Sequence, residues 1–274
     1  MKKWVFNTLF AIFALVFLTS VAYLAVYWVN SSTAAKEYTD LQQQKQEAAT
    51  TPRPTIDQEG SLVVPDTDPL TVDITDPKTG QTITVLQDYK DLYLQNTDMV
   101  GWIQIPGTNI DYPVMQTPDS PNYYLKRNFE KQNSGHGSLY LQEDCDVTNP
   151  SSNLIIYGHR MKDRTMFAQL DKFEKKDFWK QNPYIYFDTL TEMRAYKVAF
   201  VFITTATEGQ GFPYHEYASL ESEEDFKDFV RISKAYTLYY TDVDVNYGDE
   251  LITLSTCEYT RINGRLVIVA KRVV

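Results

Sequence analysis

A stretch of 26 consecutive residues near the start of the chain, residues 4–29, carries no charged side chain. A helix of that length reaches ~39 Å, which exceeds the ~30 Å hydrocarbon core of a bilayer. Lys2 and Lys3 precede the stretch, and the next charged residue is Lys36. Because positive residues are retained on the cytoplasmic side, the sequence predicts a single-pass anchor, with residues 1–3 in the cytoplasm and the remaining chain outside the cell.

The alternative for this stretch is a cleaved signal peptide. Residues 20–22, Ser-Val-Ala, have the small side chains of a cleavage site, but a signal h-region usually spans only about 7–15 residues. The apolar run continues beyond that point, and Trp4, Tyr27 and Trp28 lie near its ends, where interfacial aromatic residues are enriched. We therefore favour an uncleaved transmembrane helix, which localises the protein to the cell membrane.

Residues 30–83 are expected to form an extracytoplasmic linker. Residues 31–50 are polar and show no sustained apolar stripe, and residues 51–81 contain five prolines together with several turn-forming residues. Such a composition is typical of an extended spacer. We expect it to hold a folded unit, residues 84–274, away from the membrane surface.

The charge and the cysteine content exclude several function classes. A formal net charge of −10 argues against a nucleic-acid-binding protein, which needs a basic surface. Cys145 and Cys257 are the only cysteines and no CxxC motif exists, so a metal site built on cysteine clusters is excluded, and we expect neither a metal nor a cofactor. Outside the cell the two cysteines could pair as a disulfide, and composition alone leaves that alternative open.

The folded unit is dominated by short runs of aromatic and β-branched residues separated by Pro, Gly, Asn and Asp, the pattern of β-strands. Helical spacing is found in three further segments. We predict a β-dominated α+β fold, a closed or nearly closed antiparallel barrel with peripheral helices. The predicted strands are residues 101–105, 112–116, 137–141, 152–158, 184–189, 194–205, 237–245, 249–257 and 265–273, and the predicted helices are residues 85–96, 165–173 and 222–236.

Cys257 ends one predicted strand and Arg265 begins the next. Alternation along the first of these strands puts Ser255 and Cys257 on one face. If the two strands form an antiparallel hairpin, Cys257 and Arg265 face each other at its mouth. A neighbouring cation favours the thiolate form of a cysteine, and a guanidinium can donate hydrogen bonds to a developing oxyanion.

A base to serve this thiol has to come from one of three histidines. His136 and His215 lie in polar turns, where a solvated imidazole is expected. His159 follows a buried-type strand and Gly158, on a strand-end loop of the kind where catalytic groups concentrate. A single histidine in such a place is more often structural, and the sequence alone does not bring it next to Cys257.

Two segments carry a resemblance to a known family. "YGHRMKDRTMFAQL" (157–170) and, about a hundred residues later, "LSTCEYTRINGRLVIVAK" (254–271) resemble the two signatures of sortases, in the form found in class B. The segment "NTDMVGWIQIPGTNIDYPVMQTPDSPNYYL" (96–125) is similar to the start of the class B domain. The resemblance covers about residues 85–274, and a single-span N-terminal anchor is also what the family uses.

The resemblance implies a membrane-anchored cysteine transpeptidase on the outer cell surface. Cys257 would be the nucleophile that attacks a peptide bond within the C-terminal sorting motif of secreted proteins and forms a thioacyl enzyme. His159 would protonate the departing amine and later deprotonate the incoming one, and Arg265 would bind the carbonyl oxygen or the substrate backbone. The acceptor would be an amine of a cell-wall precursor, most often lipid II. The positions that match groove residues, the last three less securely, are Tyr157, Ser255, Glu258, Leu125, Phe212 and Tyr214.

Several alternatives stay open on sequence grounds. A pilin-polymerising class B sortase would use a pilin lysine as acceptor, and a hydrolytic cysteine peptidase would use water. A non-enzymatic adhesive domain would pair Cys145 with Cys257, although Cys145 matches no family position. The loop between Cys257 and Arg265 also holds Arg261, which could take the place of Arg265; we favour Arg265 because it begins a strand. The sorting motif and the anchored proteins are not given by the sequence.

Overall fold

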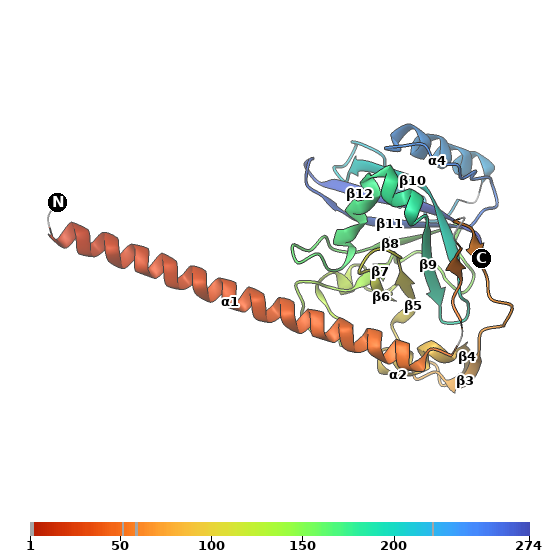
Figure 1. The fold of residues 1–274 in the computed structure, drawn as a ribbon, viewed down its shortest axis with the longest axis horizontal. Helices are drawn as coiled ribbons and strands as arrows, with labels where there is room; N and C mark the ends of the chain where they lie inside the picture. Colours follow the sequence, from red (N-terminus) through yellow and green to blue (C-terminus); the bar gives the residue numbers. More distant parts are fainter. Residues whose placement is uncertain (1–2, 51, 58–59, 221) are drawn as a thin grey trace.

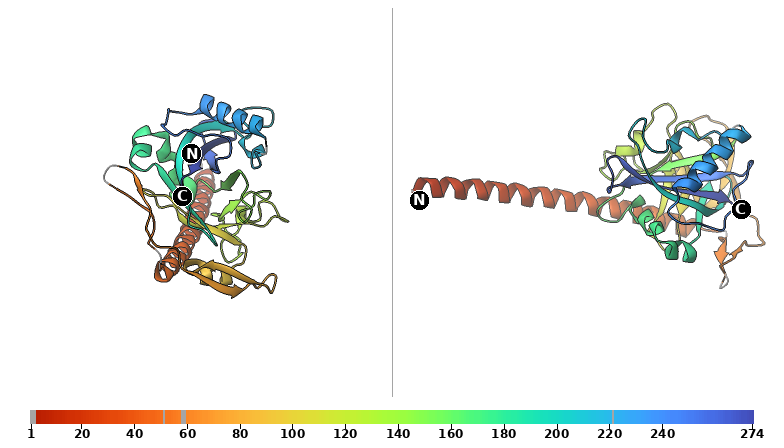
Figure 2. Two further views of the ribbon diagram at one scale, coloured as in Figure 1. Left: turned by 90° about the vertical axis from the view of Figure 1, so that its right-hand side faces the viewer. Right: turned by 90° about the horizontal axis from the view of Figure 1, so that it is seen from above.

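The computed structural model describes residues 3–50, 52–57, 60–220 and 222–274. A single long helix, α1 (Lys3–Ala48), runs out from one side of a β-barrel (Figures 1 and 2). Its N-terminal part extends away from the barrel with its apolar side chains exposed. Within the described residues it is the one helix long and apolar enough to cross a membrane.

The barrel is closed by eight strands in the order β10-β12-β11-β8-β7-β6-β5-β9, with β9 pairing back to β10. This confirms the predicted closed barrel. Two of its pairs, β6–β7 and β8–β11, are parallel, where we expected antiparallel pairing throughout. Long segments join the strands of these two pairs, so no hairpin constrains their direction. The strands are β5 (Met99–Gln104), β6 (Asp111–Met115), β7 (Leu139–Leu141), β8 (Asn153–Tyr157), β9 (Tyr184–Thr189), β10 (Ala195–Thr205), β11 (Leu251–Glu258) and β12 (Gly264–Arg272).

The strand predicted at residues 237–245 is wrong. Only an isolated bridge between Phe202 and Thr237 forms there, with Leu238 donating its backbone N–H to the Val201 carbonyl at 2.7 Å. β9 pairs with β10 only over Ala195–Lys197, and along the free edge beyond it hydrogen bonds from the Thr237 and Thr241 side chains to the β10 backbone take the place of a strand ladder.

Helices cover the outside of the barrel. The helix predicted at 222–236 is confirmed as α4 (Glu223–Tyr236), where the Ser222 hydroxyl caps the first turn by accepting from the backbone N–H of Asp225 at 3.0 Å. Phe226 and Phe229 are buried beneath it. The segment predicted at 165–173 is a 3-10 helix, η3 (Phe167–Glu174), followed by α3 (Lys176–Gln181). Two further short helices are η2 (Tyr123–Lys126) and η4 (Tyr214–Glu216).

The predicted helix at 85–96 begins later than expected. Its first residues end the strand β4 (Thr82–Leu86), and the helical part comprises η1 (Gln87–Tyr89) and α2 (Lys90–Gln95). β4 pairs with β3 (Thr71–Thr75) in a separate two-stranded sheet.

The extended spacer expected over residues 30–83 differs from the structure. Helix α1 continues to Ala48, and its last turns pack on the barrel through Ala34, Tyr38, Leu41 and Lys45, which recur at the spacing of one helix face. The Tyr38 hydroxyl donates to the Gly137 carbonyl at 2.6 Å. This contact face was missed because half of it is polar.

The proline-containing segment after α1 also lies against the barrel. Asp188 is buried on β9 and accepts hydrogen bonds from the Arg53 guanidinium and the Tyr89 hydroxyl, both at 2.5 Å. The small sheet of β1 (Thr55–Ile56) and β2 (Leu62–Val63) packs its apolar side chains against Tyr184 and Tyr186. The described parts of residues 49–86 therefore wrap the barrel, and a unit boundary at residue 84 stays a prediction.

Replacing Arg53 tests whether this segment is docked. Arg53→Ala leaves the buried Asp188 carboxylate without its cation, so we expect the free energy of unfolding to fall by about 2–3 kcal/mol and the thermal midpoint to fall by roughly 5 °C. Thermal unfolding of the full-length protein in detergent measures this. The matched control is Arg231→Ala, which breaks an exposed pair with Asp228 on α4 and should cost less than about 0.5 kcal/mol. If Arg53→Ala and Arg231→Ala lowered stability by equally small amounts, the segment after α1 would not be docked on the barrel.

Candidate active site

The parallel pairing of β8 with β11 brings two distant segments to one end of the barrel. Tyr157 lies opposite Ser255 in this register. The pairing continues past the strand end, because the Gly158 N–H donates to the Ser255 carbonyl at 3.1 Å and the Thr256 hydroxyl donates to the Gly158 carbonyl at 2.8 Å. Parallel strands keep a constant register, so the residues that follow, His159 and Cys257, lie next to each other at the strand ends.

The hairpin of β11 and β12 supplies the third side chain. Cys257 pairs with Arg265, which confirms the arrangement predicted from the sequence. The Arg265 guanidinium donates to the Gly264 carbonyl at 2.9 Å and to the Asn263 carbonyl at 3.3 Å. These two bonds orient the guanidinium at the mouth of the hairpin.

These three side chains line one cavity of about 380 Å³. Cys257, His159 and Arg265 are all partly exposed to it. The full lining is Asn122, Leu125, Tyr140, Gln142, Glu143, Tyr157, Gly158, His159, His215, Ser255, Thr256, Cys257 and Arg265.

The orientation of His159 is set by a backbone carbonyl. Its Nε2 lies 2.7 Å from the Leu125 carbonyl oxygen, and a carbonyl can only accept. Nε2 therefore carries the proton, so the neutral ring presents its lone pair on Nδ1. The backbone carbonyl of His159 accepts from the Phe167 N–H at 2.9 Å, which fixes the loop itself.

Gly158 is required at the residue before this histidine. A Cβ built there would overlap the side chains of Leu139 and Phe167. Only glycine allows the end of β8 to lie this close to β7 and η3, and this close packing determines where His159 leaves the strand.

Two tyrosines form a wall of the cavity. Tyr157 donates its hydroxyl to Gln142 Oε1 at 2.5 Å, and Tyr140 donates to Asn122 Oδ1 at 3.0 Å. Their rings lie 5.4 Å apart. Burial raises the pKa of Tyr140 to about 12 and raises the pKa of Tyr157 further above its ordinary value. Both hydroxyls therefore remain protonated donors at neutral pH.

The other sequence-predicted groove residues fall into two groups. Leu125, Tyr157 and Ser255 line the cavity, whereas the remaining three do not. Phe212 is buried in the core, where its ring packs against those of Phe202 and Phe229. Its aromatic character in a predicted loop gave no sign of this burial.

Tyr214 and Glu258 do not line the cavity but support residues near it. The Tyr214 hydroxyl lies 2.6 Å from the Ser255 hydroxyl and so supports a lining residue from beneath. Glu258 is buried and accepts from the backbone N–H and the hydroxyl of Thr260, at 2.8 and 2.7 Å. Burial opposes its ionisation, yet these hydrogen bonds outweigh burial and hold the pKa of Glu258 below its ordinary value. It shapes the turn after Cys257.

One expectation about the histidines needs correction. His136 is buried, not solvated, and its Nε2 lies 2.6 Å from Asp163 Oδ2. His215 is exposed as expected, but it lines the cavity. The sequence did not indicate four of the lining residues, Asn122, Tyr140, Gln142 and Glu143. Of these, only Tyr140 lies in a predicted strand, where the alternation of side chains could have indicated which face of the sheet it occupies.

The two cysteines are not paired. Both are free thiols, which contradicts the disulfide expected for a non-enzymatic adhesive domain. Cys145 is buried, and its sulfur accepts from the Ile155 N–H at 3.4 Å and approaches the Asn153 carbonyl at 3.5 Å. Burial raises the pKa of the Cys145 thiol to about 12. It is a core thiol, and Cys257 alone faces the cavity.

Arg261 does not line this cavity. It is exposed, and its guanidinium donates to the Ile203 carbonyl of β10 at 3.3 Å. The structure therefore favours Arg265 as the arginine that accompanies Cys257.

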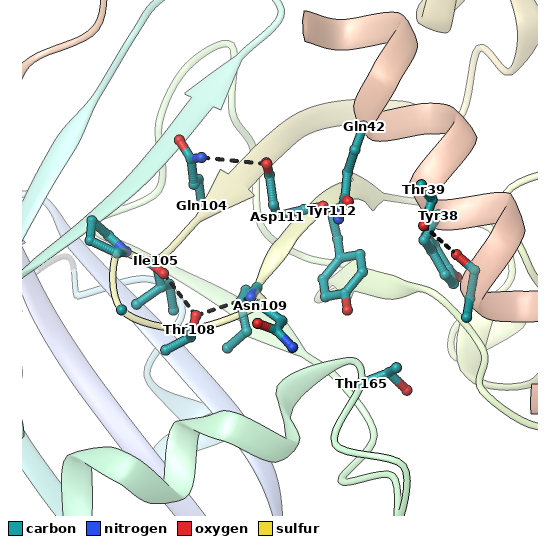
Figure 3. Close-up of a pocket in the computed structure, with 14 residues that line it drawn as sticks. Tyr38, Thr39, Gln42, Gln104, Ile105, Thr108, Asn109, Asp111, Tyr112 and Thr165 are labelled. Atoms are coloured by element: carbon teal, nitrogen blue, oxygen red, sulfur yellow. Dashed lines mark hydrogen bonds between the residues drawn. The ribbon is translucent and has the colours of Figure 1, made fainter.

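A larger cavity of about 620 Å³ lies elsewhere, between α1 and the turn that joins β5 to β6 (Figure 3). Tyr38, Thr39 and Gln42 of α1 lie across from residues 104–112. It contains no thiol or imidazole, so size does not identify the reactive site here. Within the described residues, no group of His, Cys, Asp or Glu could hold a metal ion.

Known proteins share this architecture. The sortase domain model matches residues 103–273. The chain is 37% identical over 193 residues to sortase B of Listeria monocytogenes. That alignment covers 69% of this chain and 75% of the Listeria protein. The chain is 31% identical over 189 residues to sortase B of Staphylococcus aureus, with 68% and 75% covered. The solved Staphylococcus aureus sortase B–substrate complex superposes with a TM-score of 0.69 at 26% identity, over 89% of this chain and 98% of that one.

The closed barrel and these similarities define a cysteine transpeptidase. The chain belongs to the sortase family, and within that family it is a class B sortase.

The environments of the two thiols predict different reactivities. With iodoacetamide at pH 7.5 we expect one thiol, Cys257, to be alkylated in the folded protein, and Cys145 to react at least ~100-fold more slowly, because its raised pKa and burial keep it protonated and covered. Peptide mass mapping after timed labelling measures both rates. In denaturant both should react. Rapid native labelling of Cys145 would show that its site is open.

Proposed function

We propose that this sortase is a membrane-anchored transpeptidase that cleaves a C-terminal sorting motif of secreted proteins and transfers the acyl fragment to an amine of a cell-wall precursor of the lipid II type. The observation that carries the proposal is the joint placement of Cys257, His159 and Arg265 around one cavity. The solved substrate complex of the Staphylococcus aureus relative supports a substrate-binding role for this fold.

The chemistry of acylation follows from these three groups. The Cys257 thiolate attacks the carbonyl carbon of the scissile peptide bond and forms a tetrahedral oxyanion. Protonated His159 gives its proton to the departing amine as the C–N bond breaks, which leaves a thioacyl enzyme and a free C-terminal fragment. Arg265, already oriented by two backbone carbonyls, donates hydrogen bonds to the oxyanion or to the substrate backbone.

Deacylation reverses these roles. Neutral His159 removes a proton from the incoming amine, whose nitrogen attacks the thioester carbonyl and displaces the Cys257 thiolate. The products are a new peptide bond and regenerated enzyme. Water in place of the amine gives hydrolysis, and a pilin lysine in place of the wall precursor gives polymerisation.

The anchor is part of the proposal. The apolar N-terminal part of α1 supports a single membrane span, and Lys2 and Lys3 support a cytoplasmic N-terminus with the barrel outside the cell.

Product analysis tests the reaction type. The purified enzyme is screened with a peptide library, and the best peptide is then incubated with either a wall-type branch peptide amine or a lysine-containing pilin peptide. We expect the amine of the wall-type peptide to appear in the product. Preferential use of the lysine peptide would favour pilin polymerisation, and a free acid with both acceptors would favour hydrolysis.

Cys257→Ala should abolish both cleavage and transfer, since no other described thiol faces the cavity. The matched control is Cys145→Ser, which we expect to keep activity within a few-fold of the wild type, although it should lower stability. Initial rates with the library-derived peptide measure this. If Cys145→Ser, still folded by circular dichroism, were equally inactive, the assignment of the nucleophile would be wrong.

Arg265→Ala should lower kcat/KM by ~10²–10³-fold, the usual effect of losing an oxyanion donor. Arg265→Lys should recover little, because an ammonium does not reproduce the forked donors of a guanidinium. Arg261→Ala serves as the control and should stay within about threefold, because Arg261 does not line the cavity and bonds instead to the Ile203 carbonyl. A larger loss with Arg261→Ala than with Arg265→Ala would reverse the choice of arginine.

A further inference from the structure

The end of the proposed membrane span lies directly beside the catalytic loop. Helix α1 continues without a break through Val29, where the apolar stretch ends. Two residues later the Ser31 hydroxyl donates to Asp163 Oδ2 at 2.5 Å. Two residues of helix rise only ~3 Å, so the loop that carries Asp163 and, four residues earlier, His159 is level with the end of the span.

A second loop, the β11–β12 turn, contacts the loop that carries His159 and so lies at the same height above the membrane. The β11–β12 turn, residues 259–263, follows Cys257, and the Tyr259 hydroxyl donates to the Arg160 carbonyl at 3.2 Å. The Arg160 guanidinium lies over the Tyr259 ring, 5.5 Å from its centre. Figures 1 and 2 agree that this turn lies on the side of the barrel from which α1 runs toward its N-terminus.

The tip of this turn exposes apolar side chains that the active site does not use. Tyr259 is 71% exposed and Ile262 is 85% exposed, and neither lines the cavity. Arg261 lies between them and Lys162 lies on the neighbouring loop, both exposed, although the chain as a whole carries a net charge of −10. An aromatic ring, an aliphatic tip and basic side chains together are the composition that binds an anionic membrane interface.

From this juxtaposition we infer that the β11–β12 turn, with Tyr259 and Ile262 at its tip, docks on the anionic surface of the bilayer that α1 spans. The inference rests on the proposed membrane anchor. The helix and the Ser31–Asp163 contact fix the height of the barrel, and the turn makes the second contact that fixes its tilt. The mouth around Cys257 then opens at the lipid surface, and a sorting motif is cleaved there instead of at a distance from the membrane.

Lipid photocrosslinking of the full-length protein tests this directly. Ile262 is replaced by p-benzoylphenylalanine, and the protein is reconstituted into vesicles of phosphatidylcholine and phosphatidylglycerol. Two control variants carry p-benzoylphenylalanine at position 24 or at position 273 instead. Leu24, 62% exposed on α1, reports on the span; Val273, 44% exposed, lies past the other end of β12, ~30 Å of strand away. Mass spectrometry after irradiation measures the fraction of protein bound to lipid.

We expect strong lipid labelling at position 24, labelling at position 262 at least ~10-fold above position 273, and unchanged cleavage of a soluble peptide by the position 262 protein. Labelling at position 24 without labelling at position 262 would overturn the docking and leave the anchor intact. Equal labelling at positions 262 and 273 would also overturn it, since contact would then be unselective. Absence of labelling at all three positions would overturn the anchor and the docking together.

Discussion

The parallel pairing of β8 with β11 is the constraint on which the site depends. It places Tyr157 opposite Ser255, so the two chain segments leave the barrel together and present His159 and Cys257 at one mouth. The antiparallel partner β12 then adds Arg265 on the other side of the thiol. Three side chains from three strand ends are thus fixed by backbone hydrogen bonds of the barrel, which is the rigid support that acyl-transfer geometry requires.

The same barrel is bound to its anchor through a continuous chain of contacts. Tyr38 and Lys45 of α1 bond to Gly137 and Asp111, and the segment after α1 closes over Asp188 through Arg53. Burial and a nearby guanidinium lower the pKa of Lys45 to about 8, against the opposing effect of Asp111. The continuous helix α1 and these contacts therefore leave no extended spacer between its apolar part and the barrel.

Local patterns predicted what local geometry controls. The Cys257–Arg265 pair followed from strand alternation and a short hairpin, and α4 followed from its acidic first turn and apolar face. The meeting of His159 with Cys257 depends on a parallel pair separated by about a hundred residues, which no local pattern encodes. The burial of His136 and Phe212 likewise comes from tertiary contacts with Asp163 and with the aromatic core under α4. The docking of the described parts of residues 30–83 depends on a half-polar face of α1.

The central claim is that acyl transfer passes through Cys257 at this mouth. Intact mass spectrometry of acid-quenched reactions, followed by peptide mapping, tests it most directly. With a cleavable peptide and no acceptor, we predict one acyl adduct per protein, located on the peptide that contains Cys257 and lost when an amine is added. Peptide cleavage with an adduct on Cys145, or with an adduct on Cys257 that added amine does not discharge, would contradict the account.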